Sequence, residues 1–208
     1  MRVLMMLLAM IGSMAQAEGE RAGEFDYYVM SLSWSPTWCA LEGEQRGSPQ
    51  CDKDFGWVLH GLWPQFEAGW PSFCTTRARN PSRRDTSEQA DIFGSSGSAW
   101  HQWNKHGRCS GLSSDDYYEL SREAYARIER PALLRQLDKS VRLPASVIEE
   151  AFLEANPEMS ADQITITCKA GRIQEARICL TRDLELRTCG QDVRRDCTMQ
   201  DALFDPIK

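Results

Sequence analysis

Eight cysteines constrain what this chain can fold into more than any other feature of its sequence, and all of them lie beyond residue 38. An even number of cysteines in an exported chain indicates a disulfide framework, because oxidising compartments preserve bonds that the cytosol would reduce. The alternative is a zinc site, which uses closely spaced pairs of ligands. At least seven residues separate any two cysteines here, which favours four disulfides. Spacing alone leaves on the order of 100 possible pairings.

The first seventeen residues have the organisation of a secretory signal peptide. Arg2 gives a basic start, an apolar run extends from Val3 to Met14, and Ala15-Gln16-Ala17 is a typical cleavage sequence. The apolar run is shorter than the roughly 18 residues that span a bilayer. A buried N-terminal helix is the alternative interpretation. We therefore expect residues 18–208 to form an exported protein, periplasmic or extracellular, without a membrane anchor.

The part after this segment has the size of a single domain, and we expect it to be a monomer. Without Arg2 the chain retains 23 basic and 30 acidic residues, a net charge of −7. An acidic protein gains nothing from its net charge in binding polyanions, so any nucleic-acid site must be local. Residues 75–98 are expected to be a long surface loop. Its arginines could attract RNA locally, although a solvated surface is the simpler interpretation: Arg77, Arg79, Arg83 and Arg84.

Strand and helix patterns are mixed along the chain. A capped helix is expected from Ser113-Ser114, with its apolar face at Tyr117, Leu120, Ala124 and Ile128. A second is expected from Pro144 to Asn156-Pro157. The expected strands are Phe25 to Ser33, Trp57 to Leu59, Gln163 to Cys168 and Ile173 to Leu180. Because the helices cluster between strands rather than alternating with them, the pattern indicates an α+β fold.

All three histidines fall in two short segments. Residues 55–65 read Phe-Gly-Trp-Val-Leu-His60-Gly-Leu-Trp-Pro-Gln and predict a short strand that leads His60 into a turn with Gly and Pro. Residues 100–109 read Trp-His101-Gln102-Trp-Asn-Lys105-His106-Gly-Arg-Cys. On a helix, the four numbered residues of this segment fall within an arc of about 140°. A lone histidine is more simply a packed or surface residue, but three with an interleaved lysine favour one functional surface.

This residue set suits the cleavage of an RNA phosphodiester. The 2′-hydroxyl of the substrate is the nucleophile, so the enzyme must remove its proton, protonate the 5′-leaving oxygen and stabilise the charge on the phosphoryl group. Histidine titrates near neutrality, so one imidazole can act as base while another acts as acid. A lysine and a third, charged imidazole can hold the phosphate. This chemistry requires no metal and no other cofactor.

Both histidine segments closely resemble the active-site segments of the ribonuclease T-2 family, H-G-L-W-P and H-E-W-x-K-H-G-x-C. The resemblance extends from Trp34 to Leu180. It implies an α+β fold with flanking helices around a central antiparallel sheet. It also implies secretion and metal-independent endonucleolytic cleavage of single-stranded RNA, through a 2′,3′-cyclic phosphate to 3′-phosphate ends. DNA, which lacks the 2′-hydroxyl, is not an expected substrate.

The resemblance assigns roles to four matching positions. His60 and His106 match the acid–base pair, with His106 as the base for the 2′-hydroxyl. His101 matches a histidine that holds the phosphate. Lys105 matches the cation that stabilises the pentacoordinate transition state.

Three further residues are candidates for the site. Trp63 matches the aromatic on which a base stacks, and because a π-face accepts any base, it predicts little base preference. Core packing is the alternative for Trp63. Gln65 is a further candidate for substrate binding. Gln102 departs from the family motif, which has Glu there; it can donate a hydrogen bond to phosphate but cannot carry charge, which puts the catalytic rate in question.

The resemblance also implies part of the disulfide pairing. A bond between Cys74 and Cys109 would tie the two active-site segments together, and one between Cys168 and Cys179 would close the late hairpin. Pairing of Cys39 with Cys51 and of Cys189 with Cys197 then follows by proximity.

Two functions of other classes fit parts of the sequence. One is a secreted RNA-binding protein that has lost activity through Gln102, although intact His60, Lys105 and His106 favour an enzyme. The other is a metal-dependent hydrolase that uses His101 and His106. These histidines are five residues apart, off the i, i+4 pairing of metal-binding helices, and no acidic third ligand lies near them in the sequence.

Overall fold

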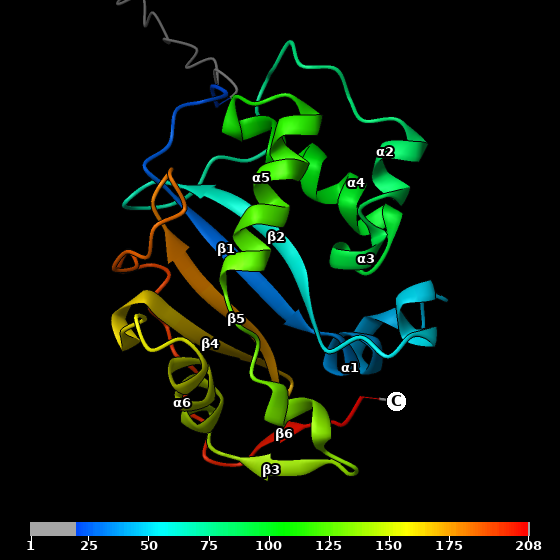
Figure 1. The fold of residues 1–208 in the computed structure, drawn as a ribbon, viewed down its shortest axis with the longest axis vertical. Coiled ribbons are helices and arrows are strands. Elements are labelled where there is room, and N and C mark those ends of the chain that lie inside the picture. Colours follow the sequence, from blue (N-terminus) through cyan, green and yellow to red (C-terminus); the bar gives the residue numbers. More distant parts are fainter. Residues whose placement is uncertain (1–19, 208) are drawn as a thin grey trace, which may run out of the picture.

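The computed structural model describes residues 20–207, so the expected signal peptide lies outside the described part of the chain. Residues 20–207 form a six-stranded sheet of strand order β2-β1-β5-β6-β3, in which β4 also pairs with β5 (Figure 1). The strands are β1 (Tyr27–Trp34), β2 (Trp57–Gln65), β3 (Val141–Leu143), β4 (Ile164–Lys169), β5 (Arg172–Leu180) and β6 (Ala202–Phe204). The α-helices are α1 (Ser35–Trp38), α2 (Arg83–Ser87), α3 (Ala90–Phe93), α4 (Ser96–Lys105), α5 (Ser114–Arg127) and α6 (Ala145–Ala155).

The α+β prediction is confirmed, and the strands pair antiparallel except for β5 with β6, which are parallel at Arg172 and Leu203. All four expected strands are present, as are the helices expected from Ser113 and Pro144. The strands β3 and β6 have three residues each, too few to give an alternating pattern in the sequence.

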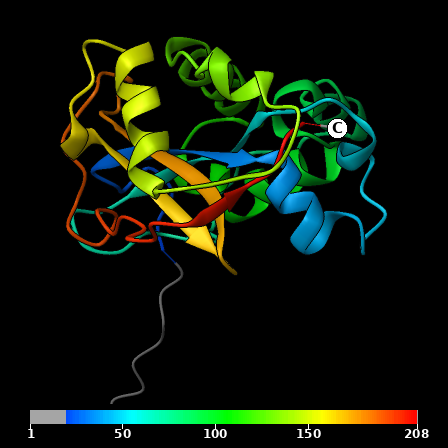
Figure 2. The same cartoon turned by 90° about the horizontal axis from the view of Figure 1, so that it is seen from below.

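Alternation along β1 separates a main core from a second layer. Tyr28, Met30, Leu32 and Trp34 belong to the main hydrophobic core. This core also contains residues of α5 and α6, and Figure 2 shows α6 on one side of the strands. The alternate residues of β1 point to the opposite face, where Tyr27 and Val29 pack with Cys179 and Cys189. On that face the next two residues are small and polar, and both are buried: Ser31 and Ser33.

The strand β2 is longer than expected and lies at the edge of the sheet. The expected turn with Gly and Pro is wrong, since Gly61 and Pro64 lie within the strand, opposite Ser31 and Tyr28. An edge strand tolerates proline because one side of its backbone needs no ladder partner. The register shifts between Ser31 and Leu32, which pair with Gly61 and Leu59, so His60 is the extra residue of a β-bulge. Bulges re-aim side chains next to active sites.

The prediction of a long surface loop over residues 75–98 is wrong in its second half. Residues 83–87 form α2, residues 90–93 form α3, and α4 begins at Ser96. The side chain of Ser82 accepts a hydrogen bond from the Asp85 amide, and the Asp85 carboxylate accepts one from the Ser82 amide. This capping box is visible in the sequence as Ser-Arg-Arg-Asp. The four arginines of the segment are exposed, as a solvated surface requires.

Two of the four expected disulfides are present and two are wrong. Cys39 pairs with Cys51 and Cys74 with Cys109, as expected. The other bonds join Cys168 to Cys197 and Cys179 to Cys189. Cys168 lies opposite Ile173, near the turn of the β4–β5 hairpin, whereas Cys179 lies beyond Ile178, which pairs with Ile164 at the start of β4. The two cysteines are therefore at opposite ends of the hairpin and cannot meet.

No helix within residues 20–207 is long and apolar enough to cross a membrane.

Candidate functional site

The seven candidate site residues all line one cavity of about 330 Å³: His60, Trp63, Gln65, His101, Gln102, Lys105 and His106. The strand β2 supplies His60, Trp63 and Gln65. The helix α4 supplies His101, Gln102 and Lys105, and His106 is its C-cap. This arrangement arises because α4 packs against the edge strand β2. A second cavity of about 660 Å³ adjoins the first, and both are lined by His60, His101, Gln102, Gln174 and Glu175.

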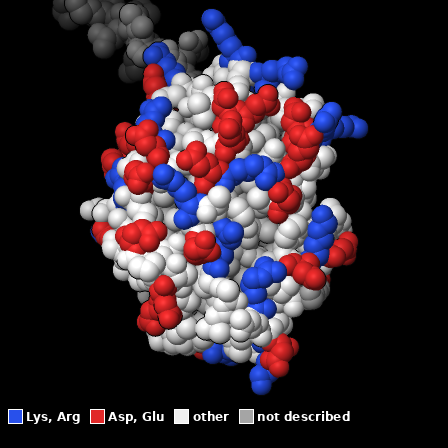
Figure 3. Space-filling view, viewed as in Figure 1, with Lys and Arg blue, Asp and Glu red and all other residues white. Residues whose placement is uncertain are grey.

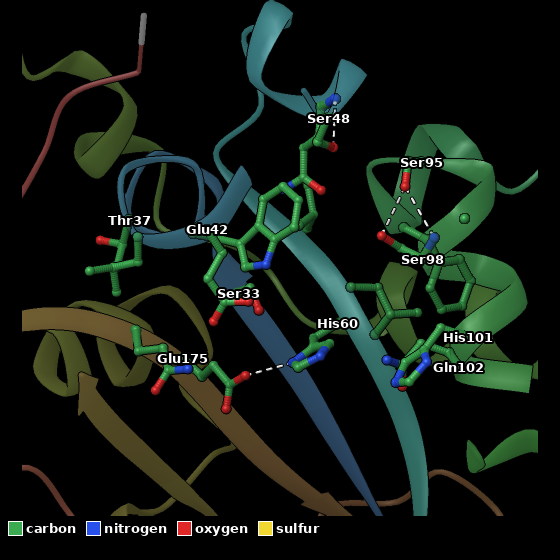
Figure 4. A pocket seen from close by; sticks show the side chains of 18 of the residues that line it. Ser33, Thr37, Glu42, Ser48, His60, Ser95, Ser98, His101, Gln102 and Glu175 are labelled. Atoms are coloured by element: carbon green, nitrogen blue, oxygen red, sulfur yellow. Dashed lines mark hydrogen bonds and ion pairs between the residues drawn. The ribbon is translucent and has the colours of Figure 1, made fainter. Parts of the chain in front are cut away.

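His60 is held by a carboxylate. Its Nδ1 lies 2.6 Å from Oε1 of Glu175 on β5, while the side chain remains 40 % exposed. Figure 4 shows this contact, with His101 and Gln102 on the other side of His60 from Glu175. The Glu175 side chain is 2 % exposed. Its second oxygen accepts hydrogen bonds from Nε and Nη2 of Arg177, at 2.9 and 2.7 Å.

The neighbours of Glu175 keep it ionised. Burial raises the pKa of this carboxyl, but the hydrogen bond and charge of His60, together with Arg177, outweigh burial and hold the pKa well below its usual range. An ionised carboxylate can only accept hydrogen bonds. The proton in the contact therefore belongs to Nδ1 of His60, which leaves Nε2 of that ring for a ligand.

The environment of His106 disfavours the charged form of its side chain. It occupies the C-cap of α4, is 5 % exposed, and its Nδ1 is buried without a hydrogen-bond partner. Burial, followed by the charges of Lys105, His60 and His101, lowers the pKa of His106 to about 3. His106 is therefore neutral in the folded protein at ordinary pH. Burial, followed by the charges of Lys105, His60 and Arg46, also lowers the pKa of His101. His101 is nevertheless an exposed residue, at the border of both cavities.

Trp63 connects the two histidine segments. Its ring stacks on His106, with centroids 5.1 Å apart and an interplanar angle of 26°, and meets His60 edge-on at 5.1 Å. The indole Nε1 donates to Oε1 of Gln102 at 2.8 Å. The guanidinium of Arg177 lies 5.5 Å from the Trp63 ring centroid. Trp63 is thus partly packed, as the alternative interpretation required, and it also lines the cavity.

Close packing at this point accounts for Gly61. A Cβ atom at Gly61 would lie 2.3 Å from both Oε1 of Gln102 and Nε1 of Trp63. Any larger residue would displace the contact between these two side chains, so glycine is required between His60 and Trp63.

Several lining residues were not among the candidates from the sequence. Glu175, Arg177, Gln174, Trp70 and Asp192 line the smaller cavity. The larger one is bordered by Glu42, whose carboxylate pairs with Lys169 at 2.6 Å and Arg46 at 2.8 Å. One signal was available: Glu175 and Arg177 are charged residues two apart inside an otherwise strand-like run, so both point to one face of β5. Their partner His60 could not be found without the sheet order.

Burial of His106 predicts a loss of stability in mild acid. An unfolded histidine binds a proton near pH 6.5, whereas folded His106 does not bind one until about pH 3. The free energy of unfolding should therefore fall as the pH drops from about 6.5 toward 3, by about 2 kcal/mol between pH 7 and 5 from this group alone. Glu175 acts in the same direction below about pH 4.5, because its stabilising ion pairs are lost as the pH falls through its lowered pKa.

Urea unfolding of the parent and of His106→Gln at pH 7 and 5 measures this effect. The variant should lose less stability between the two pH values than the parent, whereas His101→Gln should keep most of the parent's dependence because His101 is exposed. An identical pH dependence in His106→Gln and the parent would contradict the buried, neutral state of His106.

Within residues 20–207, no three His, Cys, Asp or Glu side chains are grouped so that they could hold a metal ion.

The fold and the site define a disulfide-bonded α+β protein with three histidines and a lysine gathered on one cavity. The family model described as "Ribonuclease T2 family" matches residues 25–189, and the chain belongs to this family.

Two curated relatives agree with this assignment. A "Ribonuclease" of Aeromonas hydrophila is 45 % identical over 130 residues, which cover 62 % of this chain and 58 % of the relative. A "Probable ribonuclease" of Haemophilus influenzae is 30 % identical over 120 residues, covering 51 % of this chain and 44 % of the relative. The match thus spans about half the length of these relatives. Among solved structures, an RNase-related protein from Calystegia sepium shares the fold with a TM-score of 0.66 at 19 % identity, covering 88 % of this chain and 97 % of that one.

Proposed function

We propose that this protein is an endoribonuclease that cleaves single-stranded RNA through its own histidines. The observation that carries the proposal is the pairing of two imidazoles in opposite environments on one cavity. His60 donates its Nδ1 proton to a buried, ionised carboxylate and keeps Nε2 for a ligand, whereas burial keeps His106 neutral. An acid and a base are the two groups that transphosphorylation by the 2′-hydroxyl needs.

Each proton transfer has a group available. His106 takes the proton of the 2′-hydroxyl, and the 2′-oxygen attacks phosphorus as the bond to the 5′-oxygen breaks. His60 gives its Nε2 proton to that departing oxygen, which leaves a 2′,3′-cyclic phosphate. In the second half-reaction His60 takes a proton from water, and the water oxygen attacks phosphorus. The bond between phosphorus and the 2′-oxygen breaks as His106 returns a proton to that oxygen. The end product is a 3′-phosphate.

Lys105, His101 and Gln102 complete the proposed site. We infer that Lys105 stabilises the phosphoryl charge and that His101 holds the phosphate. The Oε1 of Gln102 is engaged by Trp63, so the amide Nε2 is oriented as a donor with no hydrogen-bond partner within residues 20–207. In this position Gln102 can bind a phosphoryl oxygen without adding the negative charge that a glutamate would bring.

The two adjoining cavities fit the bases on either side of the cleaved bond. In the smaller one, Trp63 offers a ring surface, and the exposed Trp70 borders the same space together with Gln65. Stacking is tolerant of base identity, which supports low base specificity. The face seen in Figure 3 gives little electrostatic guidance to RNA, since acidic and basic side chains intermingle over it. Binding therefore depends on the cations inside the site.

We further propose that the enzyme is an exported monomer comprising one domain, residues 18–208. Four disulfides require an oxidising compartment to form, which supports the periplasm or the extracellular space. Amino-terminal sequencing of secreted material should begin near Glu18.

The decisive experiment compares RNA, DNA and 2′-O-methyl RNA of one sequence, each in excess chelator. Because the nucleophile is the 2′-hydroxyl of the substrate, only unmodified RNA should be cut, and mass analysis should find cyclic and 3′-phosphate ends. Cleavage of DNA would contradict the mechanism. Binding of RNA without turnover would indicate an RNA-binding protein instead, and sensitivity to chelator would indicate a metal-dependent hydrolase.

A further inference from the structure

We propose that Glu175, held in place by Arg177, is a positioning residue that fixes a proton of His60 on Nδ1 and thereby leaves Nε2 of that ring to act on the substrate. The inference rests on the ribonuclease activity and the histidine roles proposed above, and it adds the group that positions His60.

The contact between Glu175 and His60 spans three strands. His60 is on β2 and Glu175 on β5, and β1 runs between them. Strands that are two apart in a sheet are separated by about 9.5 Å, so such side chains meet only above small residues on the middle strand. At the level of Arg177 and Glu175, the β1 residues on this face are their partners Ser31 and Ser33. The bulge at His60 aims the imidazole across them.

The carboxylate of Glu175 is held in one orientation. It is buried, one oxygen binds His60, and the other accepts both hydrogen bonds from Arg177, which is two residues away on the same face of β5. A planar guanidinium that binds a carboxylate through two N–H groups sets its orientation as well as its charge. Glu175 is therefore presented to Nδ1 of His60 as a fixed acceptor.

The other charged or titratable groups around the two cavities do not contact His60 directly. Within residues 20–207, only Glu175 forms an ion pair or hydrogen bond with the His60 side chain. The groups that surround the two cavities from the remaining elements are Glu42 and Arg46, Lys169 on β4, Arg177 on β5, Asp192, and His101, Lys105 and His106 on and after α4. Of the other two carboxylates that line the cavities, Glu42 is paired with Lys169 and Arg46, and Asp192 accepts a hydrogen bond from the Gly69 amide. Glu175 is the one that contacts His60.

The contact with Glu175 determines which proton of His60 takes part in the reaction. During cleavage, His60 must release its Nε2 proton to the 5′-oxygen while it keeps the Nδ1 proton that Glu175 accepts. After the transfer, the neutral ring already has the tautomer that can take a proton from water at Nε2 in the second step. No proton passes to Glu175 in either step.

The test is the substitution Glu175→Gln, which keeps the shape of the side chain and removes its charge. An amide can bond to either tautomer of His60, so the proton is no longer fixed on Nδ1. We expect turnover of RNA to fall by roughly 10²-fold, within the range for loss of a proton-transfer partner, with KM nearly unchanged. Glu175→Asp should recover part of the rate.

A nucleoside 3′-(p-nitrophenyl phosphate) separates this role from a structural one. Its leaving group needs no protonation, so a variant that has lost only the acid should cleave it almost as well as the parent. We expect Glu175→Gln and His60→Ala to stay within about threefold of the parent on this substrate, whereas a variant lacking the base loses rate on both substrates. The control Glu185→Gln removes a carboxylate from an exposed pair with Arg127 and should behave as the parent on both.

Nitrogen chemical shifts of the His60 ring provide a readout that does not depend on activity. They should show the Nδ1–H tautomer in the parent and a mixture in Glu175→Gln. Equal losses by Glu175→Gln on both substrates, unchanged turnover of RNA, or an unchanged tautomer would each overturn the inference. A parent protein that leaves RNA intact would instead refute the proposed function, and this is seen before any variant is made.

Discussion

Replacing either member of the proposed acid–base pair should lower the turnover of RNA by about 10² to 10⁴-fold. The substitutions are His60→Ala at the half-exposed β-bulge and His106→Asn at the buried end of α4, where a smaller but planar and polar side chain limits the loss of packing against Trp63. Single-turnover kinetics on a short RNA measures the chemical step. The dissociation constant for a 2′-O-methyl oligonucleotide, which cannot be cleaved, should change only severalfold.

The double variant makes this prediction sharper. Groups that act as one unit give non-additive losses, so His60→Ala combined with His106→Asn should be little slower than the worse single variant. His101→Ala serves as a comparison, because a group that holds the phosphate contributes to binding and should raise KM. Near-normal turnover in either single variant would show that the roles proposed for the two histidines are wrong.

The sequence predicts the contents of the site better than its geometry. His101, Gln102, Lys105 and His106 were expected on one helical face, and α4 does bring them to one cavity. This worked because a helix is a local structure, so spacing along the chain sets the relative directions of the side chains. His60 could be recognised as a candidate, but its direction could not be derived from the sequence. It depends on a one-residue bulge between two strands that are paired over a long separation.

The same difference between local and long-range structure explains the missed residue Glu175 and the wrong disulfide pairs. Glu175 meets His60 across β1, and no local pattern specifies which strand lies between β2 and β5. The pairing of Cys168 and Cys179 was expected because both flank one hairpin, yet the register places them at its two ends. Cys39 and Cys51 pair as proximity suggests, because their loop closes on itself. Helices and local loops are thus predictable from this sequence, whereas register and strand order are properties of the whole sheet.

Removing the bond between Cys74 and Cys109 should lower both stability and activity. Each cysteine is fully buried, and the bond ties the segment after β2 to the turn that follows α4. The amide of Phe73 also donates to the carbonyl of Lys105 at 2.8 Å, so the end of α4 is held at two adjacent points. The double variant Cys74→Ala/Cys109→Ala should lose about 4 kcal/mol of unfolding free energy, from the loop-closure entropy of a 35-residue separation.

A matched control separates the stability effect from the effect on the site. The bond between Cys168 and Cys197 closes a loop of similar separation, 29 residues, so Cys168→Ala/Cys197→Ala should lose nearly the same free energy. It joins β4 to the C-terminal segment, whereas the first bond lies three residues from His106 along the chain. Assayed at a temperature where both variants remain folded, only the loss of Cys74–Cys109 should reduce turnover of RNA substantially, because it frees the end of α4 that carries Lys105 and His106. Equal activity in the two variants, or a peptide map that joins Cys109 to Cys197, would contradict this role for the bond.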